Sequence, residues 1–239
     1  MRKRCIPIFS RHFFFAALFL LLLFSAPIAA QEAKKMTIDA DHLTYNEKTK
    51  LYRIWGKVRM TQDEIVVTTK EASYDARKQV AFMTGGVTIT QPGTVVTADK
   101  GTIYLNQKKT VLSGNVRAIY DRSNETGKSP GRPSGRSGGA RFREAGRTVL
   151  TANDLEYFWA KKDGTARGDV RVVQADKTAT SDTASYFGKD DIIVLESNVQ
   201  LTRAPKDVLN CDKVTMHIRT DLVEAEGNVR GRFEVKESP

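Results

Sequence analysis

Residues 40–60 read ADHLTYNEKTKLYRIWGKVRM, and this stretch holds both elements of a repeat that decides the fold. The first element runs from Ala40 to Tyr45, and the second is Gly56-Lys57-Val58, whose valine lies thirteen residues after the tyrosine. Valines of the second element recur at intervals of 29, 29, 54, 29 and 30 residues: Val58, Val87, Val116, Val170, Val199 and Val229. Self-similarity at a fixed period indicates a repeat architecture.

The first element keeps the same thirteen-residue offset in all six copies. It begins with a small residue and ends in a large one, in the pairs Ala40/Tyr45, Thr69/Tyr74, Ala98/Ile103, Ala152/Tyr157, Ser181/Tyr186 and Cys211/Met216. Each copy is therefore one structural unit of about 29 residues.

Apolar residues within each copy lie two apart, as in Val58/Met60, which is the period of a β-strand. One extra residue separates Ile38/Ala40 from Leu43/Tyr45, and such a phase break indicates a bulge or a corner. The glycine before the valine suits a bulge or a close backbone approach, where a side chain would collide. No segment after residue 30 has a convincing helical period. The sequence predicts an all-β fold in which each repeat is a bent strand, a turn and a second strand.

Turn-forming residues separate the two strands of each copy. The predicted turns are Asn46-Glu47-Lys48, Asp75-Ala76-Arg77, Asn106-Gln107-Lys108, Lys162-Asp163-Gly164, Gly188-Lys189-Asp190 and Arg219-Thr220-Asp221.

Stacking the six copies aligns two apolar columns. One column holds Ile38, Val67, Val96, Leu150, Ala179 and Leu209, and the other holds Ile54, Met83, Leu112, Ala166, Leu195 and Ala225. A single copy buries nothing, so stacked copies are expected to bury these columns against a facing sheet. A stack of this kind has two open ends, where unpaired strand edges invite a further β-strand.

Positive charge is concentrated in two segments outside the repeats. Residues 1–30 contain four basic residues, an apolar run from Phe13 to Phe24 and a small-residue ending at Ala30, which is typical of a cleavable secretory signal peptide. An uncleaved anchor is the alternative. Residues 121–147 contain seven Lys/Arg and three Asp/Glu among many Gly, Ser and Pro residues. The remainder is close to neutral, which argues against nucleic-acid binding.

The long interval of 54 residues equals one repeat plus an insertion of about 25 residues. The predicted organisation is a signal peptide at 1–30, a first repeat block at 31–120, a flexible insert at 121–147, a second block at 148–233 and a tail at 234–239. The insert contains formal matches to a hydrolase motif at 135–139 and to the end of a P-loop at 127–129, but a low-complexity loop lacks the strand and helix that both motifs need.

A secreted chain with repeats of the form Ala-Asp-x-x-x-Tyr, a turn, and Gly-Asn-Val-x-apolar resembles the LptA/OstA-like family of periplasmic lipopolysaccharide-transport proteins. The resemblance covers roughly residues 36–120 and 148–233. It implies an open twisted β-jellyroll, built from about six stacked repeats, whose interior holds the acyl chains of lipopolysaccharide. It also implies an inner-membrane partner at the N-terminal edge near residues 36–45. Another copy, or the outer-membrane translocon, would meet the edge near 222–233.

The resemblance assigns lipid contact to apolar residues of the columns and of the Gly-x-Val elements. The candidates are Ile38, Ile54, Val58, Met60, Val67, Met83, Val87, Ile89, Val96, Leu112, Val116, Leu150, Val170, Val172, Leu195 and Val199. Core packing requires the same residue types, so only some of these side chains are expected to touch lipid.

Several alternatives remain at the level of sequence. The repeats could form a closed, ligand-free scaffold of the β-solenoid or adhesin type, or the membrane-anchored member of the same transport system. No nucleophile, base and orienting group occur together outside repeat positions, so we expect neither catalysis nor a cofactor. Asp39, Asp41 and His42 could suggest a metal, but alternation spreads them over both faces of a strand. Asp41, Asp99, Asp182 and Asp212 recur with the repeat, which favours hydrogen bonding at a turn or a corner over acid–base chemistry.

Overall fold

A computed structural model describes residues 36–121, 147–203, 207–217, 220 and 222–234. The predicted signal peptide and nearly all of the predicted insert lie outside these ranges. The strands are β1 (Thr37–Asp39), β2 (His42–Asn46), β3 (Leu51–Gln62), β4 (Ile65–Asp75), β5 (Val80–Gln91), β6 (Thr94–Tyr104), β7 (Lys109–Tyr120), β8 (Thr148–Phe158), β9 (Asp163–Gln174), β10 (Lys177–Phe187), β11 (Ile192–Arg203), β12 (Asp207–His217), β13 (Leu222–Glu226) and β14 (Arg230–Arg232). The described ranges contain no helix long and apolar enough to cross a membrane.

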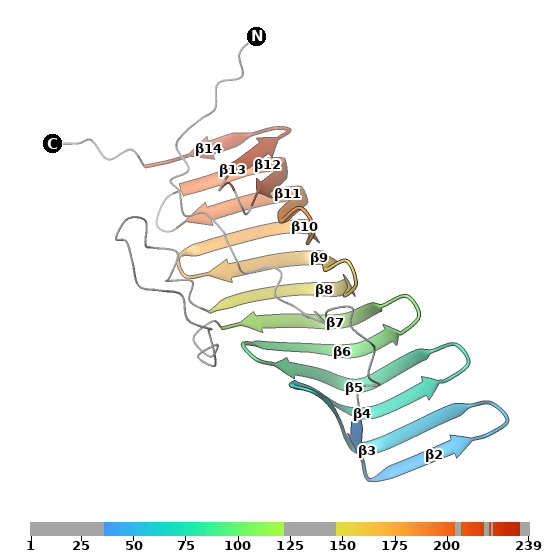
Figure 1. Ribbon diagram of the computed structural model, residues 1–239. Helices are drawn as coiled ribbons and strands as arrows, with labels where there is room; N and C mark the ends of the chain where they lie inside the picture. The colour runs from blue at the N-terminus through green and yellow to red at the C-terminus, as the bar shows by residue number, and fades with distance from the viewer. Residues whose placement is uncertain (1–35, 122–146, 204–206, 218–219, 221, 235–239) are drawn as a thin grey trace, which may run out of the picture.

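All strands belong to one antiparallel sheet, in which each strand from β3 to β12 pairs with the strand that follows it in sequence (Figure 1). Both β1 and β2 pair with β3, and both β13 and β14 pair with β12, so the 14 strands occupy 12 positions. The prediction of an all-β stack of hairpin-like repeats is confirmed.

Every strand from β3 to β12 bends in its middle, where the register with its neighbour shifts. On alternate strands two successive residues adopt positive φ at this point, as at Gly114 (77°) and Asn115 (48°). We call these positions the corners. The predicted bulge before each valine is therefore one side of a corner at which the strand changes direction.

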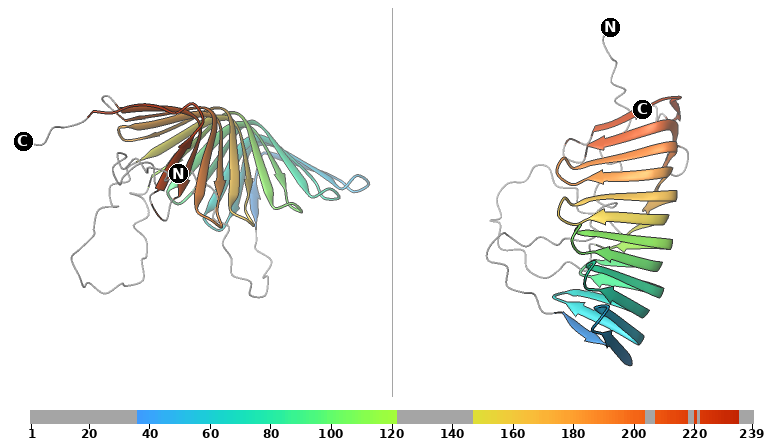
Figure 2. Two further views of the ribbon diagram at one scale, coloured as in Figure 1. Left: turned by 90° about the horizontal axis from the view of Figure 1, so that it is seen from above. Right: turned by 90° about the vertical axis from the view of Figure 1, so that its right-hand side faces the viewer.

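The corners fold the sheet into two facing halves around an apolar interior, and its twist fans the strands along the stack (Figure 2). Each predicted column lies on its own half, and buried members of both columns belong to one core cluster. This is the open twisted β-jellyroll expected from the sequence. Ile38 is the main exception, being 37% exposed on the terminal strand β1, where no further strand covers it.

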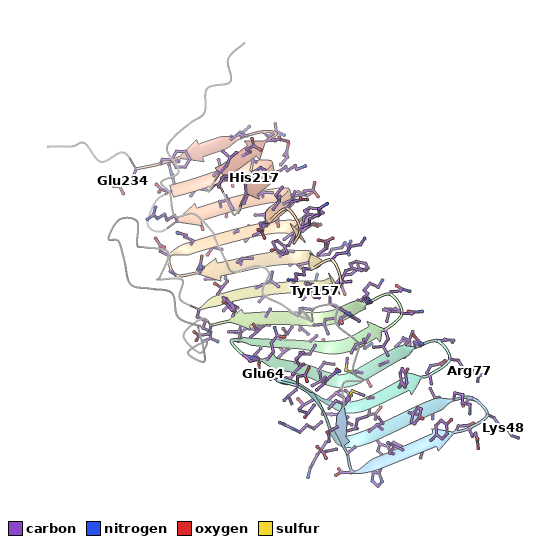
Figure 3. The ribbon with its side chains drawn as sticks, in the orientation of Figure 1. Lys48, Glu64, Arg77, Tyr157, His217 and Glu234 are labelled. Atoms are coloured by element: carbon purple, nitrogen blue, oxygen red, sulfur yellow. The ribbon has the colours of Figure 1, made fainter. Side chains whose placement is uncertain are left out.

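Hairpin turns join the strands at the edge labelled by Lys48 and Arg77 in Figure 3, and two-residue turns such as Asp63-Glu64 join them at the other edge. The predicted turn at Lys162-Asp163-Gly164 is wrong, because the turn occupies 159–162 and Asp163 already begins β9. The residues Lys, Asp and Gly are typical of turns, which led to the wrong prediction. In the repeat, however, the second strand begins six residues after the tyrosine: β3 begins six residues after Tyr45, and β9 begins six residues after Tyr157.

The insert does not interrupt the sheet. Tyr120 at the end of β7 pairs with Thr148 at the start of β8, and the two strands stay paired to Lys109 and Phe158. Residues 122–146 therefore connect two neighbouring strands at the edge where two-residue turns join the other strands.

Candidate lipid-binding interior

The 16 candidate residues all lie on strands and, apart from three near the N-terminal end, are buried. The buried set is Ile54, Val58, Met83, Val87, Ile89, Val96, Leu112, Val116, Leu150, Val170, Val172, Leu195 and Val199. Met60 and Val67 pack against the core while remaining partly exposed. The interior is thus covered along its middle and opens toward β1 and β2.

One row of inward residues runs through the turn-side half from one end of the sheet to the other. We call it the central row, and its members are paired in register: Leu43, Ile54, Ala72, Met83, Gly101, Leu112, Leu155, Ala166, Ala184, Leu195, Val214 and Ala225. Every member is apolar or glycine. Gly101 leaves the space that Met83 fills, because a Cβ there would lie 2.8 Å from the methionine methyl carbon.

Toward the hairpin turns, the interior ends in a rim rich in tyrosine. Tyr45, Tyr52 and Tyr74 form a ladder, with ring centroids 4.4 Å apart for the first pair and 6.1 Å for the second. Tyr157 continues this aromatic rim in the middle of the sheet (Figure 3), and its burial raises the pKa of its hydroxyl. A tyrosine ladder offers flat apolar surface together with polar tips.

At the opposite edge the last inward residue of nearly every strand is polar. We call this row the polar rim, and its members are Gln91, Thr94, Tyr120, Thr148, Gln174, Lys177 and Arg203, each paired in register with the next. The two rims give the interior an aromatic side and a polar side.

The recurring aspartates hold the corners together rather than forming a reactive cluster. The Asn115 amide donates to the Asp99 carboxylate at 2.8 Å, and the same bond links Asn198 to Asp182 and Asn228 to Asp212. Asp41 donates its backbone N–H to the Gly56 carbonyl. Of the two roles expected for these aspartates, at a turn or at a corner, the structure shows the corner.

The other polar residues weighed in the sequence have structural contacts. The His42 ring stacks on Trp55 with centroids 5.2 Å apart. Across the described ranges, no three His, Cys, Asp or Glu side chains are placed to share a metal ion. Cys211 is buried, and its burial raises the pKa of the thiol.

The outer face carries an ion-pair cluster at the middle of the stack. Glu156 on β8 contacts Lys109 on β7 at 3.0 Å and Arg167 on β9 at 3.3 Å. Burial raises the pKa of the Glu156 carboxyl, but the hydrogen bonds and charges of Lys109 and Arg167 outweigh it and lower that pKa overall.

Residues 66–222 match the protein family described as LptA/(LptD N-terminal domain) LPS transport protein. The chain belongs to this family. Among solved structures, LptH from Pseudomonas aeruginosa, titled the LptA homologous periplasmic component of the conserved lipopolysaccharide transport device, is similar to this chain at 11% identity and a TM-score of 0.31. The alignment covers 72% of this chain and 96% of LptH. No curated protein matches the sequence.

For this member of the transport family, sequence reasoning missed much of the interior. Fully buried Ala184, Leu201 and Val214 were not among the candidates, although each lies two or three residues from a repeat landmark. The polar rim was missed as well, although its members fall at two recurring positions, four residues after a repeat valine and 22 residues before the next one. The residue types at these positions vary among Gln, Tyr, Arg, Thr and Lys, so no shared chemistry marked them.

Proposed function

We propose that this protein is a non-enzymatic carrier that binds lipopolysaccharide by its lipid A acyl chains and helps to move it between the inner and outer membranes. The observation that carries the proposal is the central row, an unbroken apolar track from β2 to β13 that is open at both ends, in a member of the lipopolysaccharide-transport family. Similar apolar surroundings along the track allow a lipid to slide without chemistry by this chain, with energy supplied by a partner.

Acyl burial is expected to dominate affinity. Moving a chain of about twelve carbons from water into an apolar interior is favourable by order ten kcal/mol, at roughly 0.8 kcal/mol per CH₂. An exposed ion pair with a lipid phosphate adds about 0 to 1 kcal/mol. Binding through the interior should therefore depend little on salt.

A closed, ligand-free scaffold is the second candidate, and one observation favours it. Ala166, Ala184, Leu201 and Val214 are fully buried by protein atoms alone. Acyl chains can reach these side chains only when the two halves of the sheet part. The carrier proposal therefore includes a parting of the halves along their rims, whereas a scaffold would stay closed.

We propose a periplasmic location, reached through the signal peptide at residues 1–30. The exposed apolar side chains Ile38, Leu43 and Tyr45 near the N-terminal edge fit an inner-membrane partner that adds a strand. The C-terminal edge formed by β13 and β14, with Leu222 and Val229 exposed, fits the next copy or the outer-membrane translocon.

Binding of intact lipopolysaccharide and of its lipid-free oligosaccharide, each at low and high salt, tests the carrier proposal. We expect binding of the intact lipid alone and little change with salt. No binding of either probe would favour the scaffold. Equal binding of both probes that disappears at high salt would point to surface charge instead.

A matched variant separates the interior from the basic insert. Replacing residues 121–147 by Asn-Gly joins β7 and β8 through a two-residue hairpin turn like those at the same edge. Because β7 and β8 are already paired up to Tyr120 and Thr148, we expect the sheet and lipopolysaccharide binding to survive. Loss of lipopolysaccharide binding in a folded variant would show that the insert, and not the interior, holds the binding site.

A further inference from the structure

The polar rim lies on the same face of the strands as the apolar interior. Thr94 shares its face of β6 with Val96, and Thr148 shares its face of β8 with Leu150, since successive side chains alternate between faces. Neighbouring strands lie about 4.8 Å apart, so the rim extends about 19 Å from Thr94 on β6 to Lys177 on β10. Polar groups therefore border the apolar track over several strands.

Two hydroxyls of the rim are buried without a partner. Thr94 is 3% exposed and Thr148 is 1% exposed, and neither Oγ1 atom has a hydrogen-bond partner among the described residues. Both threonines pair in register with Tyr120, one on each side. A buried polar group that lacks a hydrogen bond destabilises the empty protein, and such a group in a native structure calls for an explanation.

Two other buried hydroxyls of the interior are satisfied locally. Thr69 donates its hydroxyl to the Thr84 carbonyl at 2.8 Å, and Ser181 donates to the Thr183 carbonyl at 2.9 Å. These two residues sit at corners, where the register shift frees a carbonyl. Buried hydroxyls at these two corners are thus satisfied, whereas those of Thr94 and Thr148 at the rim are not.

Farther along the rim, two cations face each other across a strand pair. Lys177 on β10 lies directly opposite Arg203 on β11, an arrangement of like charges that is unfavourable by itself. Arg203 is matched by carboxylates, since its guanidinium contacts Asp176 at 3.3 Å and Asp207 on β12 lies opposite it in register. Lys177 is half-buried. Positive charge placed beside an apolar track suits an anionic group on an acylated ligand.

We propose that the polar rim is the headgroup subsite of the lipid-binding interior, where Thr94 and Thr148 hydrogen-bond a saccharide and Lys177 contacts its phosphate. The ligand class is a phosphorylated glycolipid, and the assignment rests on the proposed function. When the halves part, acyl chains lie along the central row and the sugar meets the rim. The hydroxyls that lack partners in the empty protein then gain them from sugar hydroxyl or amide groups.

The test compares wild type with the double variant Thr94→Val/Thr148→Val, both expressed from the full sequence. Valine keeps the shape of threonine and removes only the hydroxyl. The probes are diphosphorylated lipid A and dodecanoic acid, which has an acyl chain but no sugar. We expect lipid A affinity to fall by about tenfold, since each lost hydrogen bond has a modest net effect, and dodecanoate affinity to be unchanged. The unfolding midpoint should stay the same or rise.

Matched variants complete the design. Thr94→Ser/Thr148→Ser keeps the hydroxyls and should keep lipid A affinity. Thr110→Val makes the same change on the aromatic rim, where Thr110 pairs with Tyr157. This variant should leave lipid A affinity unchanged. Lys177→Gln should weaken binding of diphosphorylated lipid A but not of its fully dephosphorylated form.

Three results would overturn the proposal, and they are distinguishable. Equal lipid A binding by wild type and Thr94→Val/Thr148→Val removes the headgroup subsite but leaves the acyl carrier intact. An equal loss of both probes in that variant indicates general damage to the interior and also removes the subsite. Failure of wild type to bind either probe overturns the proposed carrier function, and the subsite with it.

Discussion

At the scale of single residues, the corners depend on backbone conformations that glycine adopts most easily. Gly114 has a φ of 77°, and a Cβ on it would lie 2.5 Å from an Asp99 carboxylate oxygen. The equivalent position in the fifth copy is Ser197, which keeps a side chain at a φ of 64°. An L-residue in this left-handed region is destabilised by about 1 kcal/mol or more relative to glycine. The fifth corner therefore carries additional strain, because a side chain stands at both of its positive-φ positions, Ser197 and Asn198.

We predict that Ser197→Gly stabilises the protein by about 1 kcal/mol, because it removes this strain and leaves the bond between Asn198 and Asp182 in place. Equilibrium unfolding in urea measures the change as a higher midpoint. The reciprocal control is Gly114→Ala, which adds strain and a collision and should lower the midpoint. A midpoint for Ser197→Gly that equals or falls below wild type would contradict the prediction.

At the scale of elements, Glu156 ties β8 to both of its neighbours beside the insertion point. Its pKa lies below the usual value of 4.5, so the folded state binds its proton less tightly than the unfolded state. The stabilisation is therefore fully present above pH 4.5 and is lost as the pH falls through the lowered folded-state pKa.

Glu156→Gln should accordingly lower the free energy of unfolding by about 1 kcal/mol near pH 7. The gap between variant and wild type should narrow as the pH falls below 4.5, where wild type also loses the carboxylate. Urea unfolding of both proteins at several pH values measures this difference in the free energy of unfolding. Glu196→Gln is the matched control, because the Glu196–Lys213 pair is longer at 3.6 Å and more exposed, and a change near zero is expected. A pH-independent gap for Glu156→Gln would show that packing, not charge, is responsible.

The strands and their bends could be predicted because both leave local signals. Alternation of apolar residues marked the strands, and Gly-x-Val with its thirteen-residue offset marked the corner and hairpin of each copy. The sequence did not predict that Asn115 also adopts positive φ and bonds Asp99, since that contact joins neighbouring strands. Nor did it predict the polar rim, because the residue types at its two repeat positions vary, and only strand register places Thr94 and Thr148 on either side of Tyr120.

At the scale of the whole molecule, the two rims determine how copies can join. The 14 strands occupy 12 positions, an even number, so the first strand of a following copy would run antiparallel to the last strand of the preceding one. Head-to-tail addition keeps polar rim beside polar rim and extends the central row from Ala225 to Leu43 of the next copy. Joining two N-terminal ends by a two-fold rotation would instead place the polar rim against the aromatic rim. Continuity of the interior therefore favours a head-to-tail order.

This order can be tested with cysteines placed on the outer face of the terminal strands. Thr44 pairs with Arg53 and Glu224 pairs with Thr215, so in a continuous sheet Glu224 of one copy would face Thr44 of the next at about 5 Å between Cβ atoms. The native Cys211 is buried and should not react with a thiol cross-linker. We predict that Thr44→Cys/Glu224→Cys forms a ladder of linked chains with a short thiol cross-linker at high protein concentration. Each single variant should stay unlinked, whereas dimers of Thr44→Cys alone would reveal a head-to-head join that breaks the apolar track. Thr44→Cys mixed with Glu224→Cys should give linked dimers and nothing longer, because each pair of chains then has only one matching end.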